Sequence, residues 1–136
     1  MKINPYLLFD GCCEAAFKFY ADCFGTTINA MLPNRGSPVA DETPPERLDQ
    51  ILHANMMVGD VMLMGSDAPP ERYQRPQGIV VAIGVAEPAE AERVFAALAQ
   101  GGTVTMPIGE TFWALRFGML IDRFGIPWMV NCDQPT

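Results

Sequence analysis

The sequence predicts an α+β protein made of two tandem βαβββ modules, whose strands form a curved mixed sheet with the helices on its outer face and a cup inside. Two observations support this prediction: each half of the chain contains an amphipathic helix between strand-like segments, and the halves share residues at a constant spacing. The chain has 136 residues, of which 49% are hydrophobic, and this is enough to fill one compact core. We therefore expect a single domain over residues 1–136.

The two helices are predicted by apolar residues that recur every three or four positions. The first lies between Asp10 and Gly25, and Gly25 suits the left-handed residue that ends a helix. The second has Pro88 in its first turn and Gly101 after its last. The apolar positions are Cys13, Ala16, Phe17, Tyr20, Cys23 and Phe24 in the first helix, and Ala91, Val94, Phe95 and Leu98 in the second.

An internal repeat relates the two halves. At a spacing of 76 residues, identical pairs are Glu14 with Glu90, Ala15 with Ala91, Phe19 with Phe95, Gly25 with Gly101 and Thr27 with Thr103. Later the spacing becomes 66, which aligns Gly59 with Gly125, Leu63 with Met129 and Asp67 with Asp133. The first half carries the extra residues in Pro33–Arg47, a stretch rich in proline, glycine and acidic residues that is typical of a loop.

The predicted modules cover about residues 1–67 and 77–136, with a proline-rich connector between them. We expect residues 34–47 and 68–76 to be the least ordered parts of the chain. The predicted elements are strands 3–10, 26–32, 49–58 and 61–66 with helix 12–24, followed by strands 78–86, 103–107, 113–122 and 126–132 with helix 88–100.

The composition excludes several classes of partner. A net charge of −7, with two lysines and seven scattered arginines, gives no basic surface for nucleic acid or for an anionic membrane. No apolar run approaches the length that spans a bilayer, and the N-terminus lacks the pattern of a signal peptide. The four cysteines include neighbours and show no metal-binding spacing, so we expect reduced thiols and a cytoplasmic protein.

Seven short motifs occur in order over nearly the whole chain, between residues 4 and 131. They are Asn4-Pro5-Tyr6-Leu7, Ala16-x-x-Phe19-Tyr20-x-x-x-Phe24-Gly25, His53-Ala54-Asn55-Met56-x-x-Gly59-Asp60, Leu63-Met64-Gly65-Ser66-Asp67, Gly102-Thr103-Val104-x-Met106-Pro107, Thr111-Phe112-Trp113 and Asp122-Arg123-Phe124-Gly125-Ile126-Pro127-Trp128. Together these motifs resemble the PhnB-like branch of the vicinal oxygen chelate (glyoxalase/bleomycin-resistance/dioxygenase) superfamily. The resemblance implies a homodimer with a cup-shaped cavity, which in the wider superfamily often holds a divalent metal ligated by His and Glu.

The metal-binding positions that the resemblance implies lie on the first and last strand of each module. They correspond to Asn4 and Val80 on the first strands, and to Leu63, or Met64 if the register differs by one, and Met129 on the last strands. None is His or Glu, and one amide cannot hold a zinc or a hard cation. We therefore expect neither a metal nor another cofactor.

Alternation along residues 51–58 predicts which side chains face the cup. Leu52, Ala54, Met56 and Val58 are expected to face the helices, and Ile51, His53, Asn55 and Met57 to face the cup. His53, opposite Met119 in the repeat, is the best candidate for acid/base chemistry or for hydrogen bonding to a ligand. The alternative is a structural histidine bonded to Asn55 or to a neighbouring strand.

Further ligand-binding candidates are aromatic or contain sulfur. Tyr6 and Trp113 can form an aromatic wall, and Met57, Met119 and Met129 can line the cup together with Asn4. Core packing is the alternative for each apolar member of this set. Cys12 and Cys13 begin a helix, where the helix dipole favours a thiolate, but no base lies near them in the sequence.

These observations favour a metal-free protein that binds a small, partly apolar molecule of unknown identity in the cup. The alternative is a metal-dependent lyase, isomerase or dioxygenase whose ligands lie at other positions. In both cases we expect a homodimer, because curved sheets leave edges that a partner can cover.

Overall fold

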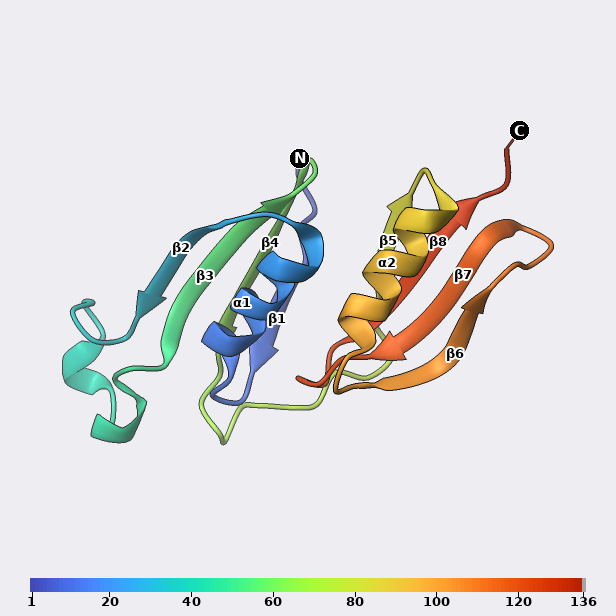
Figure 1. Ribbon diagram of the computed structural model, residues 1–136. Coiled ribbons are helices and arrows are strands. Elements are labelled where there is room, and N and C mark those ends of the chain that lie inside the picture. The colour runs from blue at the N-terminus through green and yellow to red at the C-terminus, as the bar shows by residue number, and fades with distance from the viewer. Residues whose placement is uncertain (136) are drawn as a thin grey trace. The chain divides into compact units, whose positions relative to one another are not determined.

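The computed structural model describes residues 1–135 and confirms the predicted α+β fold with two βαβββ modules (Figure 1). The chain divides into two compact units, unit 1 over Met1–Gln74 and unit 2 from Arg75 onward. Within the described residues, each unit contains a four-stranded sheet and one α-helix. In the part of the chain that is described, neither helix is long and apolar enough to cross a membrane.

Unit 1 contains a mixed sheet in the order β1-β4-β3-β2. β1 runs parallel to β4, and the other neighbouring strands are antiparallel. The connection from β1 to its parallel neighbour β4 contains α1, β2 and β3, and so it is long enough for the crossover that a parallel pairing requires. The elements are β1 (Tyr6–Phe9), α1 (Cys13–Phe24), β2 (Ile28–Pro33), the short 3₁₀ helices η1 (Ala40–Glu42) and η2 (Pro45–Arg47), β3 (Ile51–Val58) and β4 (Val61–Asp67).

Unit 2 repeats this topology with the order β5-β8-β7-β6. β5 is parallel to β8, and the remaining pairs are antiparallel. Trp113, which the sequence assigned to a strand, precedes that strand instead. The elements are β5 (Val81–Val85), α2 (Pro88–Ala99), β6 (Thr103–Gly109), β7 (Ala114–Ile121) and β8 (Pro127–Asp133).

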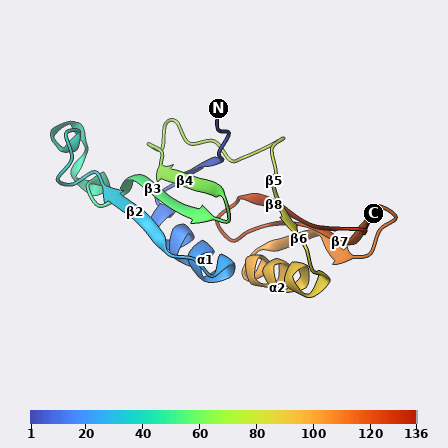
Figure 2. The ribbon, with the colours of Figure 1, turned by 90° about the horizontal axis from the view of Figure 1, so that it is seen from above.

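Each helix covers one face of its own sheet and leaves the other face without a helix (Figure 2). In unit 1, Phe17 and Tyr20 of α1 pack edge to face with each other and near Phe9 of β1. Burial of each such side chain stabilises the fold by about 1.5–3 kcal/mol. Gly25 ends α1 with φ 65, as predicted, and Pro88 occupies the first turn of α2. We call the opposite, uncovered surface of each sheet its open face.

The repeat is less regular than the sequence predicts, because the connections differ in length. Residues 10–12 join β1 to α1, whereas residues 86–87 join β5 to α2. The helices therefore correspond at a spacing of 75 residues. This spacing aligns the buried Ala91 with the buried Ala16, and not with the exposed Ala15 as the sequence predicted. The predicted pairs of Glu14 with Glu90 and Phe19 with Phe95 are displaced in the same way.

A two-residue turn joins β3 to β4, whereas five residues join β7 to β8. The register places Met64 beside Tyr6 and Met129 beside Ala82, so Met64 corresponds to Met129. The predicted partner Leu63 is therefore wrong, and the alternative Met64 is correct. In the same register Asn55 corresponds to Met119, and His53 to Phe117 instead of the predicted Met119.

The start of β3 departs from the predicted alternation. Ile51 is buried and Leu52 is 39% exposed, the reverse of the prediction. The cause is an irregular register, because Leu32 pairs with His53 and Pro33 pairs with Ile51, which leaves Leu52 as the extra residue. From His53 onward the prediction holds: Ala54 and Met56 are buried, and His53, Asn55 and Met57 are half-buried on the open face.

The long connection between β2 and β3 is held by hydrogen bonds of its own. The buried side chain of Asn34 donates to the carbonyl oxygen of Arg47 at 2.9 Å, and its backbone N–H donates to Gln50 at 3.0 Å. An exposed ion pair joins Arg35 to Asp49 at 2.8 Å. The prediction that residues 34–47 are poorly ordered stays a prediction, as does the one for the connector 68–76.

Candidate functional site

The open face of unit 1 carries one continuous row of side chains across all four strands. The register aligns Tyr6 of β1 with Met64 of β4, Asn55 of β3 and Ala30 of β2. Because directly paired residues point to the same side of a sheet, this row faces away from α1. A neighbouring row contains Leu8 and Ser66, and His53 with Leu32.

Tyr6, His53 and Asn55 form a chain of hydrogen bonds on this face. The Tyr6 Oη lies 3.2 Å from His53 Nδ1, and the Asn55 Nδ2 lies 3.2 Å from His53 Nε2. The rings of Tyr6 and His53 are tilted against each other with centroids 5.7 Å apart. Tyr6 is 45% exposed, and His53 and Asn55 are half-buried, so a ligand can reach the chain from solvent. The bond between His53 and Asn55 also matches the alternative considered from the sequence, a histidine bonded to Asn55.

Two other predicted residues of unit 1 lie apart from this chain. Met57 pairs with Met62 at the far end of β3 and is half-buried. Asn4 precedes β1, and its Oδ1 accepts a hydrogen bond of 3.3 Å from the backbone N–H of Met62. The Asn4 amide oxygen therefore connects the N-terminal segment to β4.

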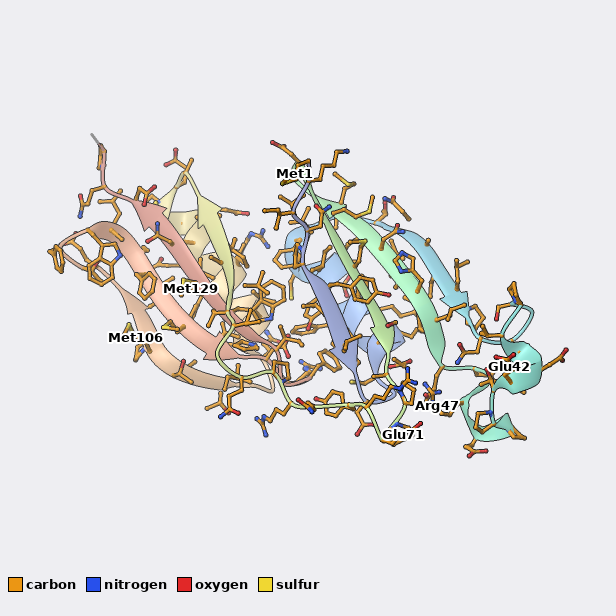
Figure 3. All side chains as sticks on the ribbon, turned by 180° about the vertical axis from the view of Figure 1, so that it is seen from behind. Met1, Glu42, Arg47, Glu71, Met106 and Met129 are labelled. Atoms are coloured by element: carbon orange, nitrogen blue, oxygen red, sulfur yellow. The ribbon has the colours of Figure 1, made fainter. Side chains whose placement is uncertain are left out.

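The open face of unit 2 presents sulfur and aromatic groups. Met106, Met119 and Met129 form a row across β6, β7 and β8, in register. Figure 3 shows Met106 and Met129 on the side of the sheet that faces away from α2. Met106 is 43% exposed, while Met119 and Met129 are half-buried. The predicted residues Met119 and Met129 are thus direct neighbours on one surface.

Aromatic side chains gather at the start of β7. Trp113 packs edge to face against Phe112, with centroids 4.8 Å apart, and against Phe117 at 5.4 Å. Phe112 is 93% exposed. Tyr6 belongs to unit 1 and Trp113 to unit 2, so the wall that these two were expected to form together stays a prediction.

Sequence reasoning missed several residues of the two open faces. In unit 1, Met64 pairs with Asn55, and Ser66 pairs with Leu8. In unit 2, Met106 pairs with Met119, and the ring of Phe117 packs against Trp113. The sequence did indicate Met64, as the last-strand position that results if the register of the repeat differs by one residue. Phe117 carried a signal, because it lies two residues from Met119 on the predicted strand 113–122 and therefore shares its face. Met106 carried none, because its place beside Met119 follows from the bulged register of β6.

The donor groups of the described residues do not fit a metal of the glyoxalase type. Residues 1–135 contain no cluster of three or more His, Cys, Asp or Glu side chains that could hold a metal ion. The last-strand positions are the thioethers of Met64 and Met129, and the Asn4 oxygen bonds to the backbone. Catalytic zinc sites use three His, Cys or carboxylate ligands, and this set does not supply them.

The cysteines at the start of α1 are poor nucleophiles. Burial, with a smaller contribution from the carboxylate of Asp67, raises the pKa of the Cys12 thiol. The same two causes raise the pKa of Cys13, which is fully buried. Asp67 lies at the helix start because its Oδ1 accepts the Cys13 backbone N–H at 2.9 Å and its Oδ2 accepts that of Ile51 at 2.8 Å. The burial and this carboxylate raise the thiol pKa by more than the helix dipole, which was expected from the sequence to favour the thiolate, can lower it.

The paired βαβββ units have the glyoxalase/bleomycin-resistance fold. The fosfomycin resistance protein FosX from Listeria monocytogenes shares this fold, with a TM-score of 0.68 over 98% of this chain and 94% of that protein, at 9% identity. At this level of identity, the likeness shows the fold alone.

Comparison with closer relatives identifies the family. The profile of the family described as 3-demethylubiquinone-9 3-methyltransferase matches residues 1–131, and the chain belongs to this PhnB-like family. It is 32% identical to protein YjdN of Escherichia coli K12, over 100% of this chain and 99% of YjdN. Among solved structures, PA1353 from Pseudomonas aeruginosa is 48% identical, with a TM-score of 0.90 and 99% of both chains covered. A Bacillus cereus PhnB protein described as a putative 3-demethylubiquinone-9 3-methyltransferase is 25% identical, with a TM-score of 0.81 over 97% of this chain and 99% of its own.

Proposed function

We propose that this protein binds a small, partly apolar molecule on the open face of its sheets without the help of a metal. One observation carries the proposal: the hydrogen-bonded chain of Tyr6, His53 and Asn55 lies on an uncovered sheet surface, between apolar side chains. Small-molecule sites are mostly apolar, with a few polar groups that fix the orientation of the ligand. The open face of unit 1 has this composition.

The open face of unit 2 supports the same proposal, because it supplies apolar groups that a ligand can contact. Thioether groups are flexible and polarizable, so a row of three adapts to ligands of different shape. The aromatic cluster of Phe112, Trp113 and Phe117 adds flat surfaces on which a planar molecule can stack.

A library of small neutral and anionic compounds, screened by thermal shift, tests the proposal. A ligand that binds the folded state alone stabilises it by RT ln(1 + [L]/Kd), about 2.7 kcal/mol at a hundredfold excess over Kd. We expect hits whose amide chemical-shift changes map to β1, β3 and β4, or to β7 and β8. Hits that map to the helices α1 and α2 instead would overturn the proposal.

Metal content separates this proposal from the alternative of a metal-dependent lyase, isomerase or dioxygenase. Elemental analysis of protein purified without an affinity tag should give less than one divalent ion per chain, and a chelator should leave the melting temperature unchanged. A stoichiometric ion whose removal lowers the melting temperature would favour the enzyme.

We also propose that the protein is a cytoplasmic homodimer. The four cysteines are free thiols, which suits a reducing compartment. Exposed edge strands such as β6, with Val104 and Met106 uncovered, support a partner chain. Sedimentation should give about twice the mass of the 14.9 kDa chain, and a monomer at micromolar concentration would contradict the dimer.

A further inference from the structure

We propose that the open face of unit 1 selects neutral carbonyl compounds, and that the hydroxyl group of Tyr6 donates the hydrogen bond that recognises them. This inference rests on the proposed function, because it names the ligand class of the same face. It follows from the direction in which the hydrogen bonds of Asn55, His53 and Tyr6 must run.

The direction is set by the Asn55 amide. Its nitrogen, Nδ2, faces His53 Nε2 at 3.2 Å, and an amide nitrogen can donate but cannot accept a hydrogen bond. His53 Nε2 must therefore be the acceptor and carry no proton. In a neutral imidazole the proton then lies on the other ring nitrogen, Nδ1.

The phenolic oxygen of Tyr6 accepts a hydrogen bond from this N–H group. His53 Nδ1 lies 3.2 Å from the Tyr6 Oη, so its N–H donates to the phenolic oxygen. The hydroxyl proton of Tyr6 is then not donated to His53 or Asn55. Within residues 1–135 the Tyr6 hydroxyl forms no other hydrogen bond. Because Tyr6 is 45% exposed on an edge strand, this proton is available to an acceptor on a ligand.

The surroundings determine which acceptor fits. The neighbouring positions on the open face are Leu8, Met64, Ala30 and Leu32, with Ser66 as a further polar group. No lysine or arginine belongs to these two rows, so a carboxylate or phosphate would lose its hydration without gaining a cationic partner. A carbonyl oxygen on an apolar body accepts the Tyr6 proton and leaves its remaining surface against leucine and methionine.

The single histidine of the chain makes the direction measurable without assignment. Protein labelled with ¹⁵N-histidine, observed by NMR above the ordinary titration range of imidazole, should show the proton on Nδ1. Asn55→Asp offers the carboxylate acceptor in place of the amide donor, so it should move the proton to Nε2. A proton on Nε2 in the unchanged protein would overturn the inference, because Tyr6 would then donate to His53.

A matched pair of probes tests the ligand class. Acetophenone and ethylbenzene have nearly the same shape, and acetophenone alone carries a carbonyl oxygen. Titration followed by amide chemical shifts should show tighter binding of acetophenone to β1, β3 and β4. Tyr6→Phe should weaken acetophenone binding about three- to tenfold, the usual range for one hydrogen bond, and leave ethylbenzene unchanged.

Tyr73→Phe is the control, because it makes the same chemical change in the connector, at a residue that belongs to neither row of the open face. If both probes bind this face equally and Tyr6→Phe changes neither, the carbonyl inference fails while the proposed binding function stands. If neither probe perturbs β1, β3 or β4, the proposed function of this face fails as well.

Discussion

Units 1 and 2 have the same strand order, yet each is held together by a different buried carboxylate. In unit 1, Asp67 at the end of β4 accepts the backbone N–H groups of Cys13 and Ile51 and so joins the helix to two strands. The corresponding residue of unit 2 is Cys132, whose thiol donates to the Ala86 carbonyl oxygen at 3.5 Å.

Unit 2 places its carboxylate in the connection between β7 and β8. Asp122 accepts the backbone N–H groups of Phe124 and Ile126, at 2.8 and 3.1 Å, and the indole N–H of Trp128 at 2.8 Å. Unit 1 has a two-residue turn at this point, with exposed Asp60. The same fold therefore tolerates different polar contacts, as long as buried donors are satisfied.

The open faces differ in the same way. The row of Tyr6, Met64, Asn55 and Ala30 in unit 1 corresponds to Ala82, Met129, Met119 and Met106 in unit 2. The row of unit 1 combines a phenol, an amide and one thioether, whereas the row of unit 2 contains three thioethers. Residues on these faces do not fill the core, so they can change without loss of the fold, and this is where the two units acquire different chemistry.

The largest effect is expected from Asp122→Ala. The substitution removes the acceptor of the Trp128 indole N–H and of two backbone N–H groups in a turn whose residues Asp122 and Ile126 are buried, and we expect a loss of about 3 kcal/mol in the free energy of unfolding. Urea denaturation measures it. Asp60→Ala in the exposed turn of unit 1 is the control and should cost little. Equal losses for the two variants would break the comparison between the two connections.

Asp67→Ala should destabilise the protein by about 2 kcal/mol, because the Cys13 and Ile51 N–H groups lose their acceptor. Cys132→Ala removes only a long thiol contact and a small buried volume, so we expect about 1 kcal/mol. Denaturation of the two variants side by side compares the equivalent positions. A greater loss for Cys132→Ala would show that this position depends on packing in both units.

The pH dependence of stability sharpens the contrast at the start of α1. Burial, and then Asp67, raises the pKa of Cys13 above the ordinary value of 9.0. Above that pH the unfolded chain releases the thiol proton while the folded chain keeps it, so the free energy of unfolding falls as pH rises, by up to about 1.4 kcal/mol per pH unit. Cys13→Ala should flatten this slope between about pH 9 and about pH 10.5. An unchanged slope would rule Cys13 out as its source.

The smallest effect on stability is expected from His53→Ala. His53 is half-buried on the open face, so its loss should cost less than about 1 kcal/mol while weakening any ligand of unit 1. Phe117→Ala, at the corresponding position of unit 2, removes a larger apolar side chain and should affect ligands of that unit alone. Melting temperature and affinity separate the cases: a large loss of stability at His53 with unchanged affinity would make it a structural histidine.

Much of the fold was predictable, because its signals are local. The period of apolar residues in α1 and α2, the proline at the start of α2 and Gly25 at the end of α1 depend on neighbours within one or two turns. The alternation around Ala54 and Met56 predicted which side of β3 is buried. The candidate site was predictable in part, since Tyr6, His53 and Asn55 were each selected from the strand pattern.

The remaining errors have one physical origin. Identical residues such as Phe19 and Phe95 suggested an alignment that burial contradicts, because one fewer residue connects β5 to α2 than connects β1 to α1. Leu52 was placed on the wrong face because a register irregularity interrupts its alternation. Differences in connection length and bulges shift every later residue along a strand by one place, and a shift of one reverses the face.

The sequence by itself therefore determined the order of the elements, the two repeated modules and the family to which the chain belongs. The tertiary structure alone decided that Tyr6, His53 and Asn55 form one hydrogen-bonded chain, that Met106 completes a row with Met119 and Met129, and that Asp67 and Asp122 satisfy buried donors. The reason is that helix and strand periods are properties of consecutive residues, whereas these contacts join segments far apart in the chain whose register is fixed only when the strands pair.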